Sequence, residues 1–290
     1  MHIPVLLQET IDGLDIKDGD VVLDMTLGGG GHAREIFLRG KRISYIGIDQ
    51  DDYAIEQAQK NLKKWQGNIK FLKGNFKDAK EMLAKEGITH VSKILFDLGA
   101  SSFQFDDPAR GFSFLHDGPL SMKMSDQTLF SAEDIVNNWR EEDIANVLYA
   151  YGEETRARKI AKAIVLARRK FAITTTTQLA DIVMRAYGKA PRGRLHPATK
   201  TFQALRIAVN GELDALKRGL ADSVDIFSPH GRIAVISFHS LEDRIVKSFM
   251  KDLSKEGWLL INKRPVVVTR EEITQNPRSR SAKLRIIEKI

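Results

Sequence analysis

Hydrophobic runs alternate with amphipathic stretches along the first hundred residues, and this pattern predicts a parallel β-sheet covered by helices. Short apolar runs of the kind that form buried strands recur at 20–24, 44–49, 69–73 and within 91–98. Segments with apolar residues at helical spacing lie between them, for example at 32–39 and 52–65. Strands that alternate with helices in this way are typical of βαβ units, so we expect an α/β fold with a Rossmann-like, doubly wound sheet.

The alternation stops near Ser101, and strand-like sequence resumes only in the last third of the chain. A stretch rich in Gly, Pro and Asp over 106–119 is followed by helical periodicity at 132–151, 153–171 and 178–187. Thr174 to Thr177 precede the third of these helices and are good helix-capping residues. The pattern then predicts, in order, a long helix at 198–220, a strand at 232–238, a helix at 241–253 and strands within 259–268 and 283–288.

The simplest organisation that fits this order is one α/β domain interrupted by an all-helical insertion. We place the first part of the core at 1–105, the insertion at 106–205 and the second part of the core at 206–290. The 290 residues are enough to bury a substantial core.

Charge is unevenly distributed along the chain, which changes the interpretation of the insertion. The net charge is +7, yet residues 152–206 alone hold thirteen Lys/Arg against three Asp/Glu, so the remainder is slightly acidic. A basic segment on a mildly acidic body favours a surface that binds a polyanion such as RNA. Solvated helix faces are the alternative explanation.

Composition excludes several classes of protein. With no cysteine, the chain can form no disulfide, no thiolate zinc site and no cysteine nucleophile. No apolar run of about 18 residues predicts a membrane span, and the first residues lack the pattern of a signal peptide. We therefore expect a cytoplasmic enzyme.

A glycine run, Gly28 to Gly31, follows the first strand and precedes a helix, as in nucleotide-binding folds. Asp49 ends the next strand, where a carboxylate can accept both ribose hydroxyls. The run also fits G-x-G-x-x-A, so a nicotinamide-dependent dehydrogenase stays open. Asp24 favours S-adenosylmethionine, because a carboxylate there can bind the cofactor's amino acid end but would face pyrophosphate in a dinucleotide site. Phe76, after the third strand, can either lie against adenine or pack in the core.

The segment 97–102, DLGASS, follows the fourth strand at the sheet edge where ligands of open α/β sheets bind. One methyl acceptor to consider at this loop is an exocyclic cytosine amine. It is a poor nucleophile, because its lone pair is delocalised into the ring. Methylating it requires acceptors for its N–H hydrogens and in-line alignment with the donor. Asp97, with the hydroxyls of Ser101 and Ser102, suits this role. Methylation at carbon 5 would normally need a cysteine adduct, which this chain cannot form.

Other chemistries fit the residues less well. Asp97 can instead be a structural cap of its loop. A hydrolase triad of Ser101, Asp97 and His239 lacks the G-x-S-x-G elbow that positions such a serine. The seven histidines include no H-x-x-x-H pair, so we predict no metal site.

Eight segments, in the same order, resemble those of the bacterial 16S rRNA cytosine-N4 methyltransferase family that acts on the decoding centre, and the resemblance runs nearly end to end. They are HIPVLLQE at 2–9, GGGGH at 28–32, DLGASS at 97–102, QFDD at 104–107, RGFSF at 110–114, HPATKTFQALR at 196–206, SFHSLEDR at 237–244 and NPRSRS at 276–281. Each is weak alone, but together they are specific.

The resemblance implies S-adenosylmethionine as cofactor and a methyltransferase core split by an RNA-binding helical insertion. It implies cofactor contacts by Gly30, Gly31, His32, Asp49, Phe76, Asp97 and Gln104. The candidates for binding 16S rRNA of the small ribosomal subunit are Arg192, Arg194, His196, Lys200, Arg206 and His239. For the two histidines, a capping or supporting role is the alternative. A homodimer is compatible with the sequence.

The chain departs from the family at two places. The family's DMRMD is Ser121-Met-Lys123-Met-Ser125 here, so both carboxylates are lost and Arg becomes Lys, which makes no planar bidentate contact. The family's SSPQ has Phe103 in place of proline. These changes keep a second hypothesis open: a paralogue that retains the cofactor pocket but serves as an RNA-binding or ribosome-assembly factor.

Overall fold

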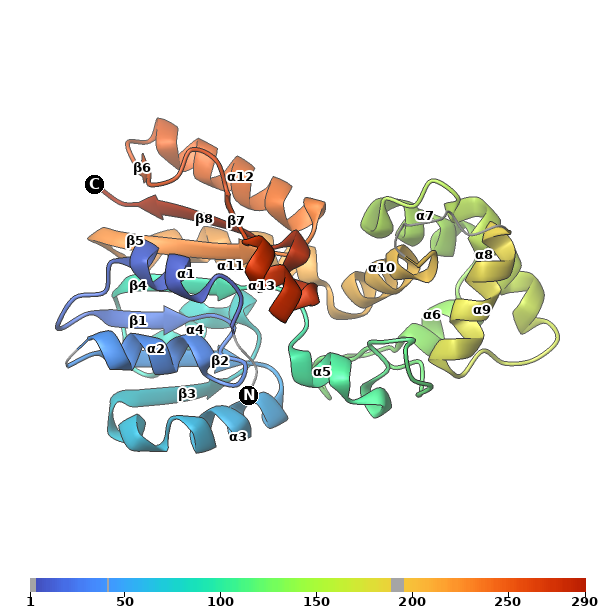
Figure 1. The fold of residues 1–290 in the computed structure, drawn as a ribbon, viewed down its shortest axis with the longest axis horizontal. Helices are drawn as coiled ribbons and strands as arrows, with labels where there is room; N and C mark the ends of the chain where they lie inside the picture. The colour runs from blue at the N-terminus through green and yellow to red at the C-terminus, as the bar shows by residue number, and fades with distance from the viewer. Residues whose placement is uncertain (1–3, 41, 189–195) are drawn as a thin grey trace. The chain divides into compact units, whose positions relative to one another are not determined.

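The computed structural model describes residues 4–40, 42–188 and 196–290, which form two compact units (Figure 1). Unit 1 consists of the chain up to Gly99 and from Leu213 onward, and unit 2 of Ala100–Glu212. The boundaries predicted from the sequence, 105/106 and 205/206, lie a few residues further into the insertion.

Unit 1 is built on one mixed sheet in the order β3-β2-β1-β4-β5-β8-β6, with β7 also paired to β8. The five strands β1 to β5 are parallel. They are β1 (Val21–Asp24), β2 (Ser44–Asp49), β3 (Ile69–Lys73), β4 (Val91–Asp97) and β5 (Phe227–Ser237). The antiparallel part is β8 (Lys283–Glu288) with β6 (Leu259–Leu260) and β7 (Val266–Val267). This order is that of a class I methyltransferase sheet, so the predicted fold class is confirmed.

Helices cover both faces of this sheet, because successive strand residues point to opposite sides. Val22 and Leu95 belong to one apolar cluster, whereas their neighbours Leu23 and Phe96 belong to the other. The first cluster is covered by α1 (Leu7–Leu14), α2 (Gly31–Arg39) and α3 (Asp52–Asn61). The second is covered by α4 (Ala79–Lys85), α11 (Glu212–Asp225) and α12 (Ser240–Lys255). Two faces covered by helices define the doubly wound arrangement.

Unit 2 is helical and has its own apolar core. Its helices are α5 (Ser102–Asp106), α6 (Ala132–Asn138), α7 (Glu141–Gly152), α8 (Ala157–Arg168), α9 (Thr176–Tyr187) and α10 (Ala198–Asn210). The predicted cap of α9 is confirmed: Thr175 is the N-cap and forms a reciprocal capping box with Gln178.

Two long helices predicted from the sequence are each broken in the structure. The stretch 198–220 divides at Gly211, whose φ of +61° is the left-handed conformation that ends α10. The stretch 132–151 divides because Trp139 and Arg140 are extended between α6 and α7. Apolar periodicity continues across both breaks, so the pattern alone did not reveal them.

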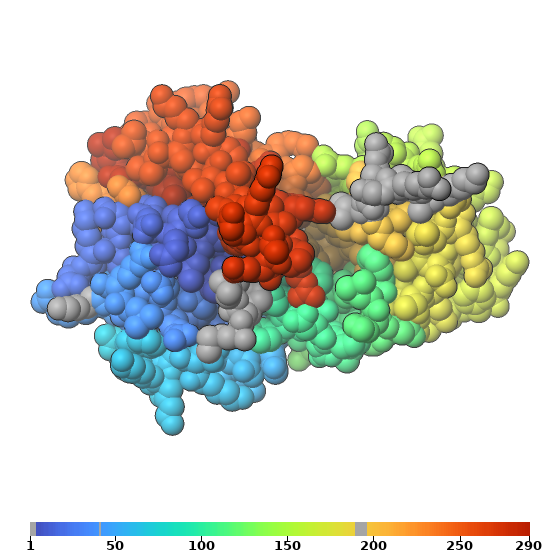
Figure 2. Space-filling view, in the orientation of Figure 1, coloured from blue at the N-terminus to red at the C-terminus, as the bar shows by residue number. Residues whose placement is uncertain are grey.

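The C-terminal segment packs on the N-terminal one. The short helix α13 (Arg270–Gln275), red-orange in Figure 2, lies at the surface of unit 1, and Glu272 Oε1 accepts a 2.8 Å hydrogen bond from the Leu6 amide. Within the described ranges, no helix is both long and apolar enough to cross a bilayer.

Candidate active site

The carboxyl ends of the parallel strands bring three aspartates to one edge of the sheet in unit 1. Asp24, Asp49 and Asp97 are the last residues of β1, β2 and β4. Because β1 pairs with both β2 and β4 in parallel, these ends meet at the same edge (Figure 1). Ligands of open α/β sheets bind at this edge.

The glycine turn between β1 and α2 adopts a conformation that requires glycine. Gly28 and Gly30 have φ values of +52° and +78°. A Cβ on Gly30 would lie 2.7 Å from the Leu62 side chain, closer than real Cβ contacts. The Gly28 amide donates a 2.8 Å hydrogen bond to Asp49 Oδ2, which ties the turn to the end of β2. This hydrogen bond fixes the glycine turn next to the end of β2, as expected of a nucleoside-binding loop.

Asp97 is held at the end of β4 with one oxygen unsatisfied. Its backbone amide donates to Thr26 Oγ1 at 2.6 Å. Its Oδ1 is buried and has no hydrogen-bond partner among the described residues, while the side chain as a whole is 27% exposed. Oδ2 lies 3.7 Å from His32 Nδ1, and His32 is buried at the start of α2. A buried carboxylate oxygen without a partner is a feature that a ligand would complete.

Burial also changes the acidity of this edge. It raises the pKa of Asp97 to about 8, and the negative charges of Asp24 and Glu242 add to the effect. Burial likewise raises the pKa values of Asp24 and Asp49 to about 6. Each carboxyl group thus resists ionisation in the protein alone.

The raised pKa values indicate the charge of the ligand that fits. A cation placed among the three carboxylates would favour their ionised forms, whereas a pyrophosphate would meet repulsion. S-adenosylmethionine carries a sulfonium and an ammonium group, so these residues fit that cofactor. A nicotinamide dinucleotide, the alternative that the glycine run left open, is disfavoured by the same charges.

Asp24 was expected to bind the amino acid end of S-adenosylmethionine, but its side chain is already engaged within unit 1. It is only 2% exposed, and its two oxygens accept hydrogen bonds from the Tyr45 hydroxyl at 2.7 Å and the Thr26 amide at 3.1 Å. These contacts leave little surface for the amino acid end of a ligand. Its contribution to the site is its charge and its support of the turn that carries Thr26.

Phe76 is positioned by two neighbours after β3. Its ring packs edge-on against Phe96, with centroids 5.6 Å apart. Gly219 of α11 also lies close to the ring, and a Cβ there would be 2.8 Å from Phe76 Cδ2. Gly219 is therefore a positioning residue that sequence reasoning missed, because an isolated glycine in a helical pattern carries no indication of what approaches it.

This contact gives a first prediction. Replacing Gly219 with Ala would push the Phe76 ring from its place, so we expect a roughly tenfold loss of affinity for S-adenosylhomocysteine, about 1.4 kcal/mol. Isothermal calorimetry measures it. The matched control is Ser254→Ala in α12, a half-buried helical position outside the predicted site. Unchanged affinity in a folded Gly219→Ala protein would remove Phe76 from the adenine subsite.

His239, predicted near the acceptor base, is the N-cap of α12. It forms a reciprocal capping box with Glu242, whose carboxylate accepts from the His239 and Phe238 amides. The alternative of a capping role for His239 therefore has direct support. Glu242 itself is 2% exposed and adds negative charge near Asp97.

Three residues predicted for catalysis or cofactor binding belong to unit 2. Ser101 and Gln104 form a capping box at α5: Gln104 Oε1 accepts from the Ser101 amide at 3.0 Å, and Ser101 Oγ accepts from the Gln104 amide at 3.3 Å. Gln104 is only 5% exposed. Ser102 begins the same helix. These residues therefore stabilise the start of α5, the helix that follows β4.

The predicted RNA-contacting residues have varied surroundings. His196 is exposed, accepts from the Ala198 amide and packs on Phe114. Lys200 donates to the Glu153 carbonyl, whereas Arg206 forms a two-bond ion pair with Glu212 in which both side chains are nearly buried. Arg192 and Arg194 lie outside the described residues.

The segment that departs from the family, 121–125, is held mainly through its backbone. Asn210 donates to the Met122 carbonyl at 2.8 Å and accepts from the Met124 amide at 2.9 Å. Met122 has a φ of +60°, an uncommon conformation for this residue type. Because the anchoring atoms belong to the backbone, the changes at Ser121 and Ser125 leave these bonds possible.

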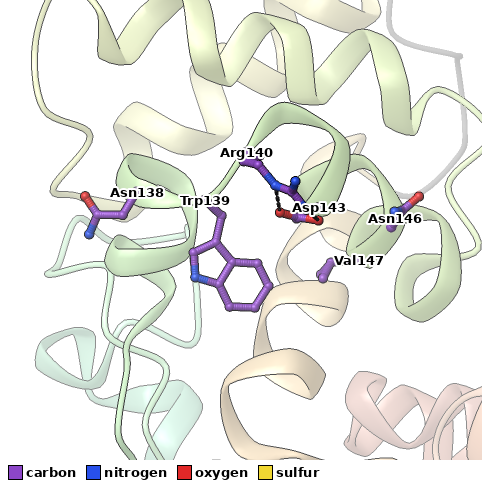
Figure 3. Close-up of a pocket in the computed structure, with 6 residues that line it drawn as sticks. All are labelled: Asn138, Trp139, Arg140, Asp143, Asn146 and Val147. Carbon is purple, nitrogen blue, oxygen red and sulfur yellow. Dashed lines mark hydrogen bonds and ion pairs between the residues drawn. The ribbon is translucent and has the colours of Figure 1, made fainter.

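A surface pocket in unit 2 was not predicted. It lies where α6 meets α7 and is lined by Asn138, Trp139, Arg140, Asp143, Asn146 and Val147 (Figure 3). Arg140 pairs with Asp143 through two bonds of 2.7 and 3.0 Å. None of the residues predicted for methyl transfer lines it.

Comparison with known proteins adds independent information. A family model described as "MraW methylase family" matches residues 1–290. The chain is 44% identical to "Ribosomal RNA small subunit methyltransferase H" of Carboxydothermus hydrogenoformans over 305 residues, covering 100% of this chain and 98% of that protein. It is 48% identical to the protein of the same name from Deinococcus radiodurans over 292 residues, covering 99% and 89%.

Solved structures are similar at lower identity. A putative rRNA-methylase from Clostridium thermocellum aligns with a TM-score of 0.49 and 14% identity, covering 100% of both chains.

Proposed function

The chain belongs to the MraW methylase family, and from that premise we propose that it methylates the N4 amine of a cytosine in 16S rRNA. The donor is S-adenosylmethionine, which supplies an electrophilic methyl group. The substrate is the small ribosomal subunit or its RNA, at the decoding centre, in the cytoplasm. The observation that carries the proposal is Asp97, a carboxylate with an unsatisfied buried oxygen at the ligand-binding edge of the sheet.

Different residues of unit 1 bind different parts of the donor. The Gly28–Gly31 turn allows close approach of a nucleoside, and Asp49 can accept ribose hydroxyls in addition to the Gly28 amide it already holds. Phe76 provides an aromatic face for adenine. Asp24 and Glu242 keep the edge negative, which favours a cationic donor over its neutral product.

Asp97 has the chemistry that an amine acceptor needs. Its ionised carboxylate accepts an N–H hydrogen bond, which returns electron density to a nitrogen whose lone pair is delocalised. Methyl transfer would form the N–C bond, break the S–C bond of the donor and leave S-adenosylhomocysteine. The nitrogen would release one proton, and a carboxylate whose pKa is raised to about 8 can hold it. His32, 3.7 Å from Asp97 Oδ2, orients the carboxylate from the side of α2.

The experiment that tests this proposal is methyl transfer from labelled S-adenosylmethionine, followed by nucleoside analysis. With small-subunit RNA or assembled subunits as acceptor, we expect label in N4-methylcytidine. Label in another nucleoside would overturn the assigned atom. A protein that binds S-adenosylhomocysteine and RNA but transfers nothing would instead be the binding factor that the departures at 121–125 kept open.

A further inference from the structure

One face of α8 carries exposed cations at helical spacing. Arg158, Lys162 and Arg169 lie at i, i+4 and i+11, so they project from one side of the helix, which continues with helical geometry through Arg169. Lys159 and Lys170 lie beside them, and all five are exposed. We call these five residues the α8 stripe. In the described part of the chain, none of them forms an ion pair.

The cations of the α8 stripe differ from several other described basic residues of unit 2, which form contacts within the unit. Arg206 pairs with Glu212, Lys200 donates to the Glu153 carbonyl, and Arg168 donates to the Val136 carbonyl. Arg156 packs over the Tyr187 ring. Cations that make no internal contact remain solvated and are available to an external anion.

Charge is segregated within unit 2. Residues 131–155, which include α6 and α7, hold seven Asp/Glu and one Arg, whereas residues 156–206 hold thirteen Lys/Arg and one Asp. The pocket at the α6–α7 junction (Figure 3) therefore lies on an acidic segment that would repel a polyanion. The net positive charge of the insertion is therefore the sum of two different segments. The acidic segment 131–155 disfavours RNA, and the basic segment 156–206 favours it.

We propose that the α8 stripe binds the phosphate backbone of the RNA substrate; this inference rests on the proposed function. From Arg158 to Arg169 the helix rises about 17 Å, a span that several successive phosphates of one strand can follow. Two exposed apolar side chains adjoin the stripe, Leu166 and Phe171, and an aromatic ring there can stack on an unpaired base.

A lipid surface fits the stripe less well than RNA does. An interfacial helix must insert its apolar face between lipids. The apolar face of α8, including Ile160 and Ile164, is fully buried in the core of unit 2. Among the apolar side chains of α8, only Leu166 is exposed. One apolar residue offers little surface for insertion between lipids, so the stripe suits a soluble polyanion better.

The test is a triple variant of the full chain, Arg158→Gln, Lys162→Gln and Arg169→Gln, compared with the unaltered protein. Binding to a transcript of small-subunit rRNA is measured at several salt concentrations. Each lost phosphate contact lowers the slope of log K against log [salt] by about 0.7 to 0.9, so we expect a slope smaller by about 2 and affinity at least tenfold lower. Affinity for S-adenosylhomocysteine should not change, because none of the residues predicted to bind it belongs to the α8 stripe.

The matched control replaces three exposed cations of unit 1, Lys60, Lys63 and Lys85, with Gln. This variant loses the same charge, and we expect its salt slope to stay within error of the unaltered protein. Equal losses in both variants would mean a diffuse charge effect and would overturn the proposal.

Other outcomes separate this inference from the proposed function. Methyl transfer to RNA by the unaltered protein, with full RNA affinity in the triple variant, would overturn the α8 stripe alone. Loss of binding to phosphatidylserine vesicles but not to RNA would assign the stripe to a membrane instead. No methyl transfer to RNA by the unaltered protein would contradict the proposed function itself.

Discussion

Replacing Asp97 with Asn is expected to lower kcat/KM for methyl transfer by about 10³-fold, the largest effect of any single change. The amide keeps the shape of the side chain but cannot take the proton that the amine releases. It also removes a negative charge, so affinity for the cationic S-adenosylmethionine should fall more than affinity for the neutral S-adenosylhomocysteine. Asp252→Asn, at an exposed position in α12, is the control for charge loss.

The same variant should be more stable at alkaline pH. Burial raises the pKa of Asp97 in the folded protein to about 8, against about 4 in an unfolded chain. Ionising Asp97 therefore costs folding free energy, and the cost grows as pH rises from about 4 to 8. We expect the unliganded Asp97→Asn protein to match the unaltered protein at pH 4 and to exceed it above pH 8 by on the order of 1–3 kcal/mol, or several degrees in Tm.

Thermal unfolding at a series of pH values measures this difference. A gain that is independent of pH would show that packing, not ionisation, distinguishes the two side chains. Retained methyl transfer in Asp97→Asn would remove the carboxylate from its role as proton acceptor.

Replacing Asp49 with Ala is expected to weaken binding of S-adenosylhomocysteine by about 100-fold, equivalent to about 2.7 kcal/mol. Asp49 Oδ2 accepts from the Gly28 amide and Oδ1 from the Asp51 amide. The variant loses the ribose acceptor and also the bond that ties the glycine turn to β2. Calorimetry measures the affinity, and circular dichroism checks that the fold survives.

Asp52→Ala is the matched control for this second prediction. Asp52 is a nearby carboxylate at the start of α3, but it is exposed and pairs with Lys73 at the surface. Exposed pairs contribute little to stability, so this variant should bind the ligand normally. If Asp49→Ala bound as tightly as Asp52→Ala, the nucleoside would have to lie away from β2.

The sheet was predictable because burial on both faces leaves a clear pattern. Strands β1 to β4 appear in the sequence as short apolar runs, each followed by a helix, and their ends locate Asp49 and Asp97 at one edge. Helix breaks were less predictable. The left-handed turn at Gly211 requires only one glycine, and the extended residues Trp139 and Arg140 carry no breaker residue at all.

The sequence located the site residues that lie at strand ends. It did not show the features of the site that depend on tertiary contacts. The unsatisfied Asp97 oxygen, the Thr26 hydroxyl that holds the Asp97 amide, and the approach of Gly219 to Phe76 arise from packing between distant segments. The engagement of Arg206 with Glu212 likewise follows from the turn between α10 and α11. A residue type alone does not show whether its charge is already neutralised.

The most direct test of the account is a crystal structure with S-adenosylmethionine bound. We expect the adenosine over the Gly28–Gly31 turn, the ribose hydroxyls on Asp49 and the sulfonium methyl directed toward Asp97. A donor molecule bound elsewhere on the chain, or one that leaves Asp49 and Asp97 without contact, would contradict the assignment of this sheet edge as the methyl-transfer site.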